Sequence, residues 1–244
     1  MARSARKERE IKEREELILD VGRRILLDEG FAALTMDRIA AEIEYSKGTV
    51  YQHFAGKADV LAALAARTHE KRTGFFERAA TFNGTPRERI MAVGVADDLF
   101  VRLFPSHFRA EQIILLTGDT DTVAGERIEA CFSHEARCFQ ICTGIVRDGV
   151  ARGDLVLEPP MSIEGLTFGL WSSSFGVHYL GGVLERFDGP DMGGDPFVVL
   201  GANINAMLDG HGFRPLSSEH DYFETMDRVR REIFSEELAE LEGD

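Results

Sequence analysis

An all-α fold in two domains is predicted for this chain of 244 residues. Three observations support it. Apolar residues recur at helical spacing through most of the sequence, no convincing alternating strand pattern occurs, and the character of the chain changes after Gly74. The composition, 44% hydrophobic and 29% charged, is close to that of average globular proteins. We therefore expect a small N-terminal domain over residues 1–68 and a larger helical domain over residues 69–244.

The N-terminal domain begins with a long amphipathic helix. Apolar residues recur at helical spacing over residues 8–29, and Gly30 follows as a stop signal. Thr35 then precedes a short second helix as its N-cap, Ser46 caps a third, and Lys57 opens a fourth. Two short helices separated by a tight turn and braced by longer ones are the parts of a three-helix helix-turn-helix unit.

The larger domain consists of further helical runs separated by Gly, Pro or Asp. Thr85 and Pro86 are typical of an N-cap and the first helical position. An amphipathic run near the end contains Tyr222 and Ile233, and we expect Ser217 and Ser218 to cap it. The other runs expected to be helical are residues 86–104, 108–116, 123–150, 163–184 and 196–208.

The net charge of −14 is unevenly distributed. Residues 1–60 hold 11 Lys and Arg against 12 Asp and Glu, whereas the remainder holds 17 against 30. Two stretches of the N-terminal part, residues 1–7 and 45–58, contain basic residues and no carboxylate. Because the field near a contact surface governs nucleic-acid binding, the overall acidity does not exclude it. We interpret the acidic remainder as a solvated surface.

No secretory or membrane signal is present. The N-terminus is charged and lacks an apolar signal-peptide region, and the three cysteines are few, so a reducing cytoplasm is the expected location. The longest uncharged span, residues 165–184, contains serines, glycines and His178. These residues favour a buried helix over a membrane span.

One motif carries the functional prediction. Residues 39–61 read IAAEIEYSKGTVYQHFAGKADVL. They resemble the DNA-binding domains of the TetR/AcrR transcriptional regulators, which have an alanine-rich helix, a turn, a Ser-Lys-Gly-x-hydrophobic-Tyr-x-His-Phe recognition helix and a lysine that begins the next helix. The resemblance covers roughly residues 10–65. It departs at Glu44 and Tyr45, where the family has a small residue and then Gly. We expect the turn to be re-shaped because Tyr45 lacks glycine's freedom at positive φ.

The third helix has the chemistry of a DNA reader. A major groove admits one helix, whose N-terminal residues reach the base edges. Lys47 suits guanine, and Gly48 lets the backbone approach the bases closely. Thr35 and Lys57 begin helices, where free N–H groups favour a phosphate. The predicted DNA contacts are Thr35, Ser46, Lys47, Gly48, Thr49, Tyr51, Gln52, His53 and Lys57.

Two alternatives stay open for these residues. Tyr51 could be a core residue with an exposed hydroxyl, and His53 could cap its helix instead of contacting DNA. The N-terminal arm with Arg3, Arg6 and Lys7 is either a disordered tail or a minor-groove contact.

Cys131, His134, Cys138 and Cys142 fall on one stripe of one helix. A straight helix cannot wrap four ligands around zinc, and cysteines seven residues apart are too distant for a disulfide. We interpret the cysteines as small apolar residues of the core or of a pocket, with thiol sensing as the alternative. No metal site is expected.

The resemblance implies a homodimer that binds a pseudo-palindromic DNA operator. It places the dimer contact on the helices of residues 163–184 and 196–208. A stripe of small residues on the first of these suits close helix packing, although packing within one chain is the alternative. The stripe comprises Gly165, Gly169, Ser172, Ser173 and Gly176.

The resemblance also implies that a small apolar or amphipathic effector enters the larger domain and releases the DNA. Aromatic residues are abundant on helices that can enclose a cavity. The expected ligand-binding residues are Phe100, Phe104, Phe139, Trp171, Phe175, His178 and Tyr179.

No catalytic motif stands out. The sequence has no glycine-rich phosphate loop, zinc-protease helix motif or nucleophile elbow, so we expect neither an enzyme nor a cofactor. Two alternatives remain: an enzyme fused to a DNA-binding module, and a TetR-like protein that acts through partners without small-molecule control. The sequence does not identify the effector or the operator, or distinguish repression from activation.

Overall fold

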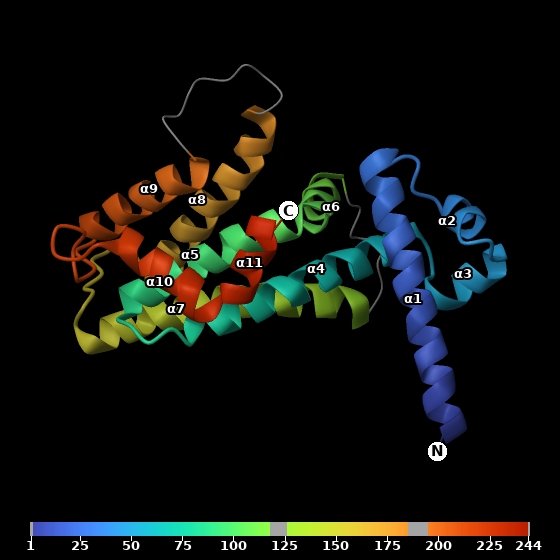
Figure 1. Cartoon of the computed structure of the whole chain (residues 1–244), viewed down its shortest axis with the longest axis horizontal. Coiled ribbons are helices and arrows are strands. Elements are labelled where there is room, and N and C mark those ends of the chain that lie inside the picture. Colours follow the sequence, from blue (N-terminus) through green and yellow to red (C-terminus); the bar gives the residue numbers. More distant parts are fainter. Residues whose placement is uncertain (1, 118–125, 185–194, 244) are drawn as a thin grey trace. The chain divides into compact units, whose positions relative to one another are not determined.

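The computed structural model describes residues 2–117, 126–184 and 195–243, and within these ranges every regular element is a helix (Figure 1). The all-α prediction is therefore confirmed. The helices are α1 (Ala2–Asp28), α2 (Met36–Glu42), α3 (Lys47–His53), α4 (Lys57–Ala80), α5 (Pro86–Leu103), α6 (Pro105–Thr117), α7 (Glu126–Arg152), α8 (Ile163–Leu184), α9 (Pro196–Gly210), α10 (Tyr222–Ile233) and α11 (Ser235–Gly243). None of these described helices is long and apolar enough to span a membrane.

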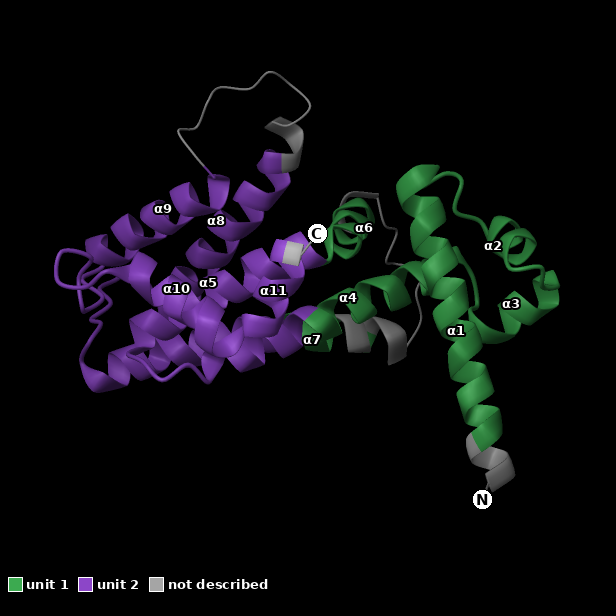
Figure 2. Ribbon diagram, in the orientation of Figure 1, with its two compact units in different colours: residues 1–71, 104–135 green, residues 72–103, 136–244 purple. Residues whose placement is uncertain are grey.

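The chain forms two compact units (Figure 2). The first comprises residues 1–71 and 104–135, and the second comprises residues 72–103 and 136–244. The first unit is larger than the expected domain of residues 1–68. The reason is that α6 packs against α1 and adds Ala110 and Ile114 to the core of the helix-turn-helix.

Apolar faces of α1, α2, α3, α4 and α6 form the core of the first unit. Gly30 ends α1 with a positive φ of 88°, as its sequence position predicted. The most completely buried side chains of this core are Ile18, Ile25, Leu26, Leu34, Ile39, Val50 and Val60.

Polar contacts also hold α6 on its neighbours. The buried imidazole of His107 on α6 contacts the Arg23 guanidinium of α1, and its Nδ1 lies 3.2 Å from the Thr68 hydroxyl of α4. One turn along α6, Glu111 lies 3.5 Å from His69 of α4, and both side chains are only 5% exposed. Burial, together with the nearby positive charge of Arg23, lowers the pKa of His107 to about 4.

The second unit is built around α5, which is buried along most of its length. The predicted cap of this helix is confirmed: the Glu88 N–H donates to the Thr85 hydroxyl at 3.2 Å, and the Glu88 carboxylate accepts from the Thr85 N–H at 2.8 Å. The strongly amphipathic α10 packs Met226 and Val229 against α5.

The expected cap of α10 is wrong. Asp221 caps the helix and accepts hydrogen bonds from the N–H groups of Phe223 and Glu224. Ser217 instead donates its N–H and hydroxyl to Asp209 at the end of α9. The serine is therefore held by a distant carboxylate that local spacing does not reveal.

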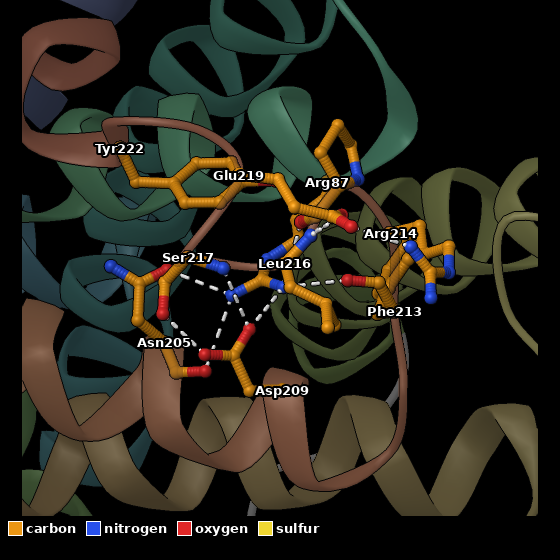
Figure 3. Close-up of polar contacts among 10 residues, drawn as sticks. Arg87, Asn205, Asp209, Phe213, Arg214, Leu216, Ser217, Glu219 and Tyr222 are labelled. Carbon is orange, nitrogen blue, oxygen red and sulfur yellow. Dashed lines mark hydrogen bonds and ion pairs between the residues drawn. The ribbon is translucent and has the colours of Figure 1, made fainter.

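Arg87, at the start of α5, is the most deeply buried charge among the described residues of the second unit. Figure 3 shows its polar contacts. Its side chain is 0% exposed and donates to the Asp209 carboxylate at 2.6 Å. It also donates to the carbonyls of Phe213 and Pro215 and to the backbone and side-chain oxygens of Asn205. The guanidinium lies 4.4 Å from the centre of the Tyr222 ring. One side chain thus joins α5, α9, the segment after α9, and α10.

We expect Arg87→Met to lower the free energy of unfolding by about 3–5 kcal/mol, because it leaves the buried oxygens of Phe213 and Asn205 without their donor and removes the counterion of Asp209. Urea denaturation followed by circular dichroism measures this. Arg147→Met is the matched control, since Arg147 forms an exposed pair with Glu164, and it should cost less than about 1 kcal/mol. Equal costs for the two variants would show that the Arg87 network is not structurally dominant.

The contribution of His107 to stability should fall in acid. Its pKa is about 4 when folded and about 6.5 when unfolded, so the unfolded chain takes up the proton first. The contribution is complete above pH 6.5 and is lost as the pH falls towards 4. We expect the stability difference between the protein and His107→Gln to shrink by about 1–2 kcal/mol between pH 7 and 4.5, allowing for solvent screening. Unfolding curves of both, with His211→Gln as control, test this, and a pH-independent difference would contradict it.

Candidate nucleic-acid interface

The two helices of the helix-turn-helix are capped as the sequence predicted. The Thr35 hydroxyl accepts from the Arg38 N–H at 3.1 Å, and the Ser46 hydroxyl accepts from the Thr49 N–H at 3.1 Å. Each cap satisfies one of the free donors of its helix and fixes where the helix starts. The Ser46 and Thr49 hydroxyls lie 2.8 Å apart, so these two side chains stabilise the first turn of α3 together.

The turn between α2 and α3 differs from the expectation. The residue with positive φ is Glu44, at 56°, and not Tyr45. The Tyr45 N–H donates to the Ala40 carbonyl at 3.0 Å and closes the turn. The left-handed position is therefore one residue earlier than the sequence suggested, and Tyr45 keeps an ordinary conformation with its side chain 39% exposed.

One face of α3 is exposed and polar. Tyr51 is 51% exposed, Gln52 is also exposed, and Val50 on the opposite face is completely buried. A Cβ atom added to Gly48 would meet only the Ser46 hydroxyl oxygen, at 3.8 Å, so the backbone is open to close approach there. The exposure of Tyr51 disfavours the alternative in which it is a core residue.

Lys47 projects from the start of α3 and pairs with a carboxylate of α2. Its Nζ lies 2.5 Å from Asp37 Oδ2, and both side chains are 60% exposed. An ion pair this exposed contributes little to stability, so it exchanges readily for another partner. Sequence reasoning missed Asp37, although its position in the first turn of α2 could have indicated a partner for a nearby cation.

Two predicted contacts point elsewhere in this structure. The His53 side chain is 6% exposed, and its Nδ1 lies 3.6 Å from Glu15 of α1. The Lys57 ammonium lies 3.5 Å from the centre of the Phe31 ring and donates to the Phe31 carbonyl. Burial lowers the pKa of Lys57. His53 thus packs α3 on α1, and Lys57 secures the loop before α2.

The N-terminal arm is helical, because α1 starts at Ala2. This excludes the disordered tail within the described residues. Arg6 pairs with Glu10 at 2.8 Å one turn later. The side chain of Arg3 lies outside the described residues.

Carboxylates pair with most other basic groups near the motif. Arg38 donates to Glu29 and Glu42, and Arg24 lies 2.6 Å from Glu42. These contacts raise the pKa of Arg38 and lower that of Glu42. The surface around α2 is therefore largely self-neutralised, which leaves α3 as its polar, open part.

The predicted ligand residues do not form one group. Phe100 is completely buried, with the Arg72 guanidinium 4.8 Å from its ring centre. Phe104 belongs to the first compact unit, where it packs edge-on against His107. Trp171 is 47% exposed. The other four predicted residues are half-buried: Phe139 lies on α7, and Phe175, His178 and Tyr179 lie on α8. The rings of Phe175 and Tyr179 stack with their centres 6.2 Å apart.

A hollow of about 670 Å³ lies over α9 and residues 217–223, and none of the predicted ligand residues lines it. Its lining combines the small side chains Ala202 and Ala206 with the polar groups of Asn205, Asp209 and His220. This hollow therefore does not match the expected apolar effector site.

Cys138 and Cys142 are half-buried on α7 and pack against the core of the second unit, while the side chain of Cys131 lies outside the described residues. Burial raises the pKa of the Cys142 thiol to about 12. Since the thiolate is the reactive form, this disfavours thiol sensing at Cys142.

The small residues of α8 have more than one role. A Cβ atom added to Gly169 would lie 3.6 Å from Met207 of α9, so Gly169 faces a helix of the same chain. The hydroxyls of Ser172 and Ser173 donate to the Gly169 carbonyl. Large apolar side chains are exposed on α8 and α9 instead, namely Phe168 at 57%, Trp171 at 47%, Leu180 at 54% and Val198 at 50%.

Comparison with known proteins agrees with this architecture. The pattern described as "Bacterial regulatory proteins, tetR family" matches residues 18–64. The HTH-type transcriptional repressor KstR of Mycolicibacterium smegmatis is 32% identical over 79 residues, 32% of this chain and 39% of that protein. The HTH-type regulator TtgW of Pseudomonas putida is 39% identical over 61 residues, 25% of this chain and 46% of that protein. The matches span less than half the length of either curated relative.

Solved structures extend the fold similarity beyond the helix-turn-helix. The TetR family regulator PfmR of Thermus thermophilus has a TM-score of 0.58 at 17% identity, over 79% of this chain and 97% of that one. A tetR family protein from Rhodococcus RHA1 has a TM-score of 0.58 at 21% identity, over 82% and 97% of the two chains. Residues 18–64 of the chain therefore match the tetR family of bacterial regulatory proteins, and the described helices have the fold of solved proteins of that family.

Proposed function

We propose that this protein is a transcriptional regulator that inserts α3 into the major groove of an operator. The observation that carries the proposal is the exposed polar face of α3 within the segment that matches the tetR family. Members of that family are DNA-binding regulators and not enzymes. A major groove admits one helix, and Tyr51 and Gln52 extend from α3 where such a groove would lie.

The proposed DNA contacts are of two kinds: some read the base edges, and others position the protein on the phosphates. Lys47 donates to a base acceptor, Gly48 admits the backbone, and Thr49, Tyr51 and Gln52 complete the reading face. Thr35 and Ser46 position the protein on phosphates at helix starts, and Lys57 does so once its ammonium exchanges the Phe31 carbonyl for a phosphate. The proposal assigns His53 to packing α3 on α1 and does not include it among the DNA contacts.

A homodimer on a pseudo-palindromic site follows from the same reasoning. Phe168, Trp171 and Leu180 of α8 and Val198 of α9 are large apolar residues exposed on an isolated chain. Clusters of such residues mark protein contacts, and a two-fold interface buries the same patch on both partners.

We also propose that an apolar or amphipathic effector binds within residues 69–244 and weakens DNA binding. KstR, which shares the N-terminal motif, is a repressor by name, and this supports repression here. An effector acts only through its differential affinity for the DNA-competent and incompetent states. Genes next to operators recovered by genomic pull-down with the purified protein would indicate its chemistry.

Lys47→Ala should weaken operator binding by about 1–3 kcal/mol per half-site and relax the base preference there.

Asp37→Asn should strengthen operator binding, because DNA binding no longer has to break the ion pair between Lys47 and Asp37. We expect affinity to rise about two- to fivefold per subunit and the salt slope to steepen by about one. Fluorescence anisotropy on the recovered operator and on a random duplex, over a salt series, measures both.

Controls separate these effects. The Asp37→Asn effect should vanish in the Lys47→Ala background, whereas Glu44→Gln removes an exposed charge nearby without touching the pair. Lys57→Met keeps the apolar contact with Phe31 and should weaken operator and random DNA about equally. If Lys47→Ala and Lys57→Met both leave operator affinity unchanged at physiological salt, α3 is not the recognition helix.

Trp171→Glu should raise the dimer dissociation constant at least about tenfold, because it places a charge on the exposed apolar patch that Phe168 and Trp171 form on α8. Sedimentation equilibrium gives the constant. Val156→Glu makes the same change at a residue that is 68% exposed outside the patch and should leave association unchanged. A folded Trp171→Glu protein that dimerises as tightly as the parent would remove α8 from the interface.

A further inference from the structure

Asp97 is a largely buried carboxylate of α5, with its side chain 15% exposed, that receives side chains from two other helices of the second unit. The Ser174 hydroxyl of α8 donates to Oδ2 at 2.6 Å, and His178 Nε2 of the same helix lies 3.4 Å from that oxygen. Arg72 Nε of α4 lies 3.6 Å from Oδ1. Burial would raise the pKa of Asp97, but the contacts with His178, Arg72 and Ser174 outweigh it and lower the pKa to about 2. The carboxylate is therefore ionised at neutral pH.

The structure leaves room beside this carboxylate. Gly94 precedes Asp97 by one helical turn, and a Cβ atom added there would meet no other heavy atom within 4 Å. Between Met91 and Phe100, where α5 is otherwise buried, Gly94 and Asp97 are the two residues that remain partly accessible.

Apolar groups surround the polar ones. Phe100 lies one turn beyond Asp97 and packs edge-on against Phe75 at 6.0 Å. The ring of His178 stacks on Phe197 of α9 at 6.1 Å. Half-buried Cys142 of α7 is a protonated thiol close enough to interact electrostatically with Asp97. An ionised carboxylate, a hydroxyl and an imidazole thus meet within a mainly hydrophobic environment.

We propose that Asp97, Ser174 and His178 bind the polar end of the effector, and that this effector is an apolar molecule with one uncharged hydrogen-bonding group, such as an alcohol. The inference rests on the proposed effector-dependent function and specifies its ligand. A hydroxyl donates to the carboxylate and accepts from Ser174 or His178, and its tail lies along the aromatic groups.

The charges of Asp97 and Arg72 favour an effector whose head group is neutral. A carboxylate would place a second negative charge against Asp97, and desolvating both would be costly. An ammonium would compete with Arg72 for the same carboxylate and weaken that ion pair. A neutral donor avoids both penalties.

The site also provides a route for a response. A ligand hydroxyl at Oδ2 of Asp97 replaces contacts that join α5 to Ser174 and His178 of α8, while Arg72 of α4 keeps its ion pair with Oδ1 of the same carboxylate. The α4 helix runs without interruption from Lys57 to Ala80. A change in the hydrogen-bond partners of Asp97 therefore acts, through Arg72, on α4, the helix that follows the recognition helix α3.

Three probes with the same eight-carbon tail test the head-group preference: 1-octanol, octanoate and octylammonium. Isothermal titration calorimetry on the full-length protein should give the tightest binding for 1-octanol. Ser174→Ala should weaken 1-octanol about fivefold, the equivalent of one hydrogen bond. Ser172→Ala is the control, because the Ser172 hydroxyl donates to the carbonyl of Gly169 in its own helix.

Asp97→Asn should weaken 1-octanol more strongly, and if it fails to fold, Ser174→Ala decides alone. Tighter binding of octanoate or octylammonium, equal effects of the Ser174 and Ser172 variants, or no binding of 1-octanol at its solubility limit would each overturn the proposal. Operator binding without probe is measured on the same variants. If the protein binds its operator but the three probes do not bind in the expected order, only this effector site is refuted. If the unsubstituted protein does not bind operator DNA, the proposed function is refuted.

Discussion

The buried guanidinium of Arg87 organises the second unit, because many acceptors from segments distant in sequence converge on it. Asp209, Asn205 and the carbonyls of residues 213 and 215 must all be in place before this charge is solvated by the protein (Figure 3). The surrounding packing is equally restrictive. A Cβ atom on Gly149 of α7 would lie 2.7 Å from the Phe213 ring, so only glycine fits there. The chain after α9 is therefore held in one conformation, which positions α10 against α5.

The helix-turn-helix follows a different electrostatic principle. Its basic residues are mostly paired with carboxylates on the protein surface, as Arg38 is with Glu29 and Glu42. Such exposed pairs add little stability but reduce the net attraction of the unit for phosphate. Under the proposed function, non-specific affinity is therefore expected to stay low, and binding to depend more on the fit of α3 to base edges. The nearly balanced charge of residues 1–60 is consistent with a DNA reader of this kind.

Local sequence patterns predicted the features that depend on local physics. The caps at Thr35, Ser46 and Thr85 were identified because a hydroxyl at a helix start satisfies donors within its own first turn. Features that depend on distant partners could not be predicted in this way. Ser217 is held by Asp209, and α6 joins the first unit through contacts with α1. The predicted ligand residues were chosen by aromatic type alone, which cannot indicate that Phe104 and Phe100 belong to different units.

Two buried charges of α5, Arg87 and Asp97, show how a structural group differs from a group available for binding. Arg87 is completely unexposed and surrounded by close acceptors, so any exchange of partner would leave a buried group unsatisfied. Asp97 accepts from Ser174 at 2.6 Å, lies 3.4 Å from His178 and 3.6 Å from Arg72, and has open space one turn away at Gly94. A ligand donor can therefore replace a weak contact there without displacing a tightly packed one. The same helix thus fixes the fold at its first turn and provides an exchangeable polar site three turns later.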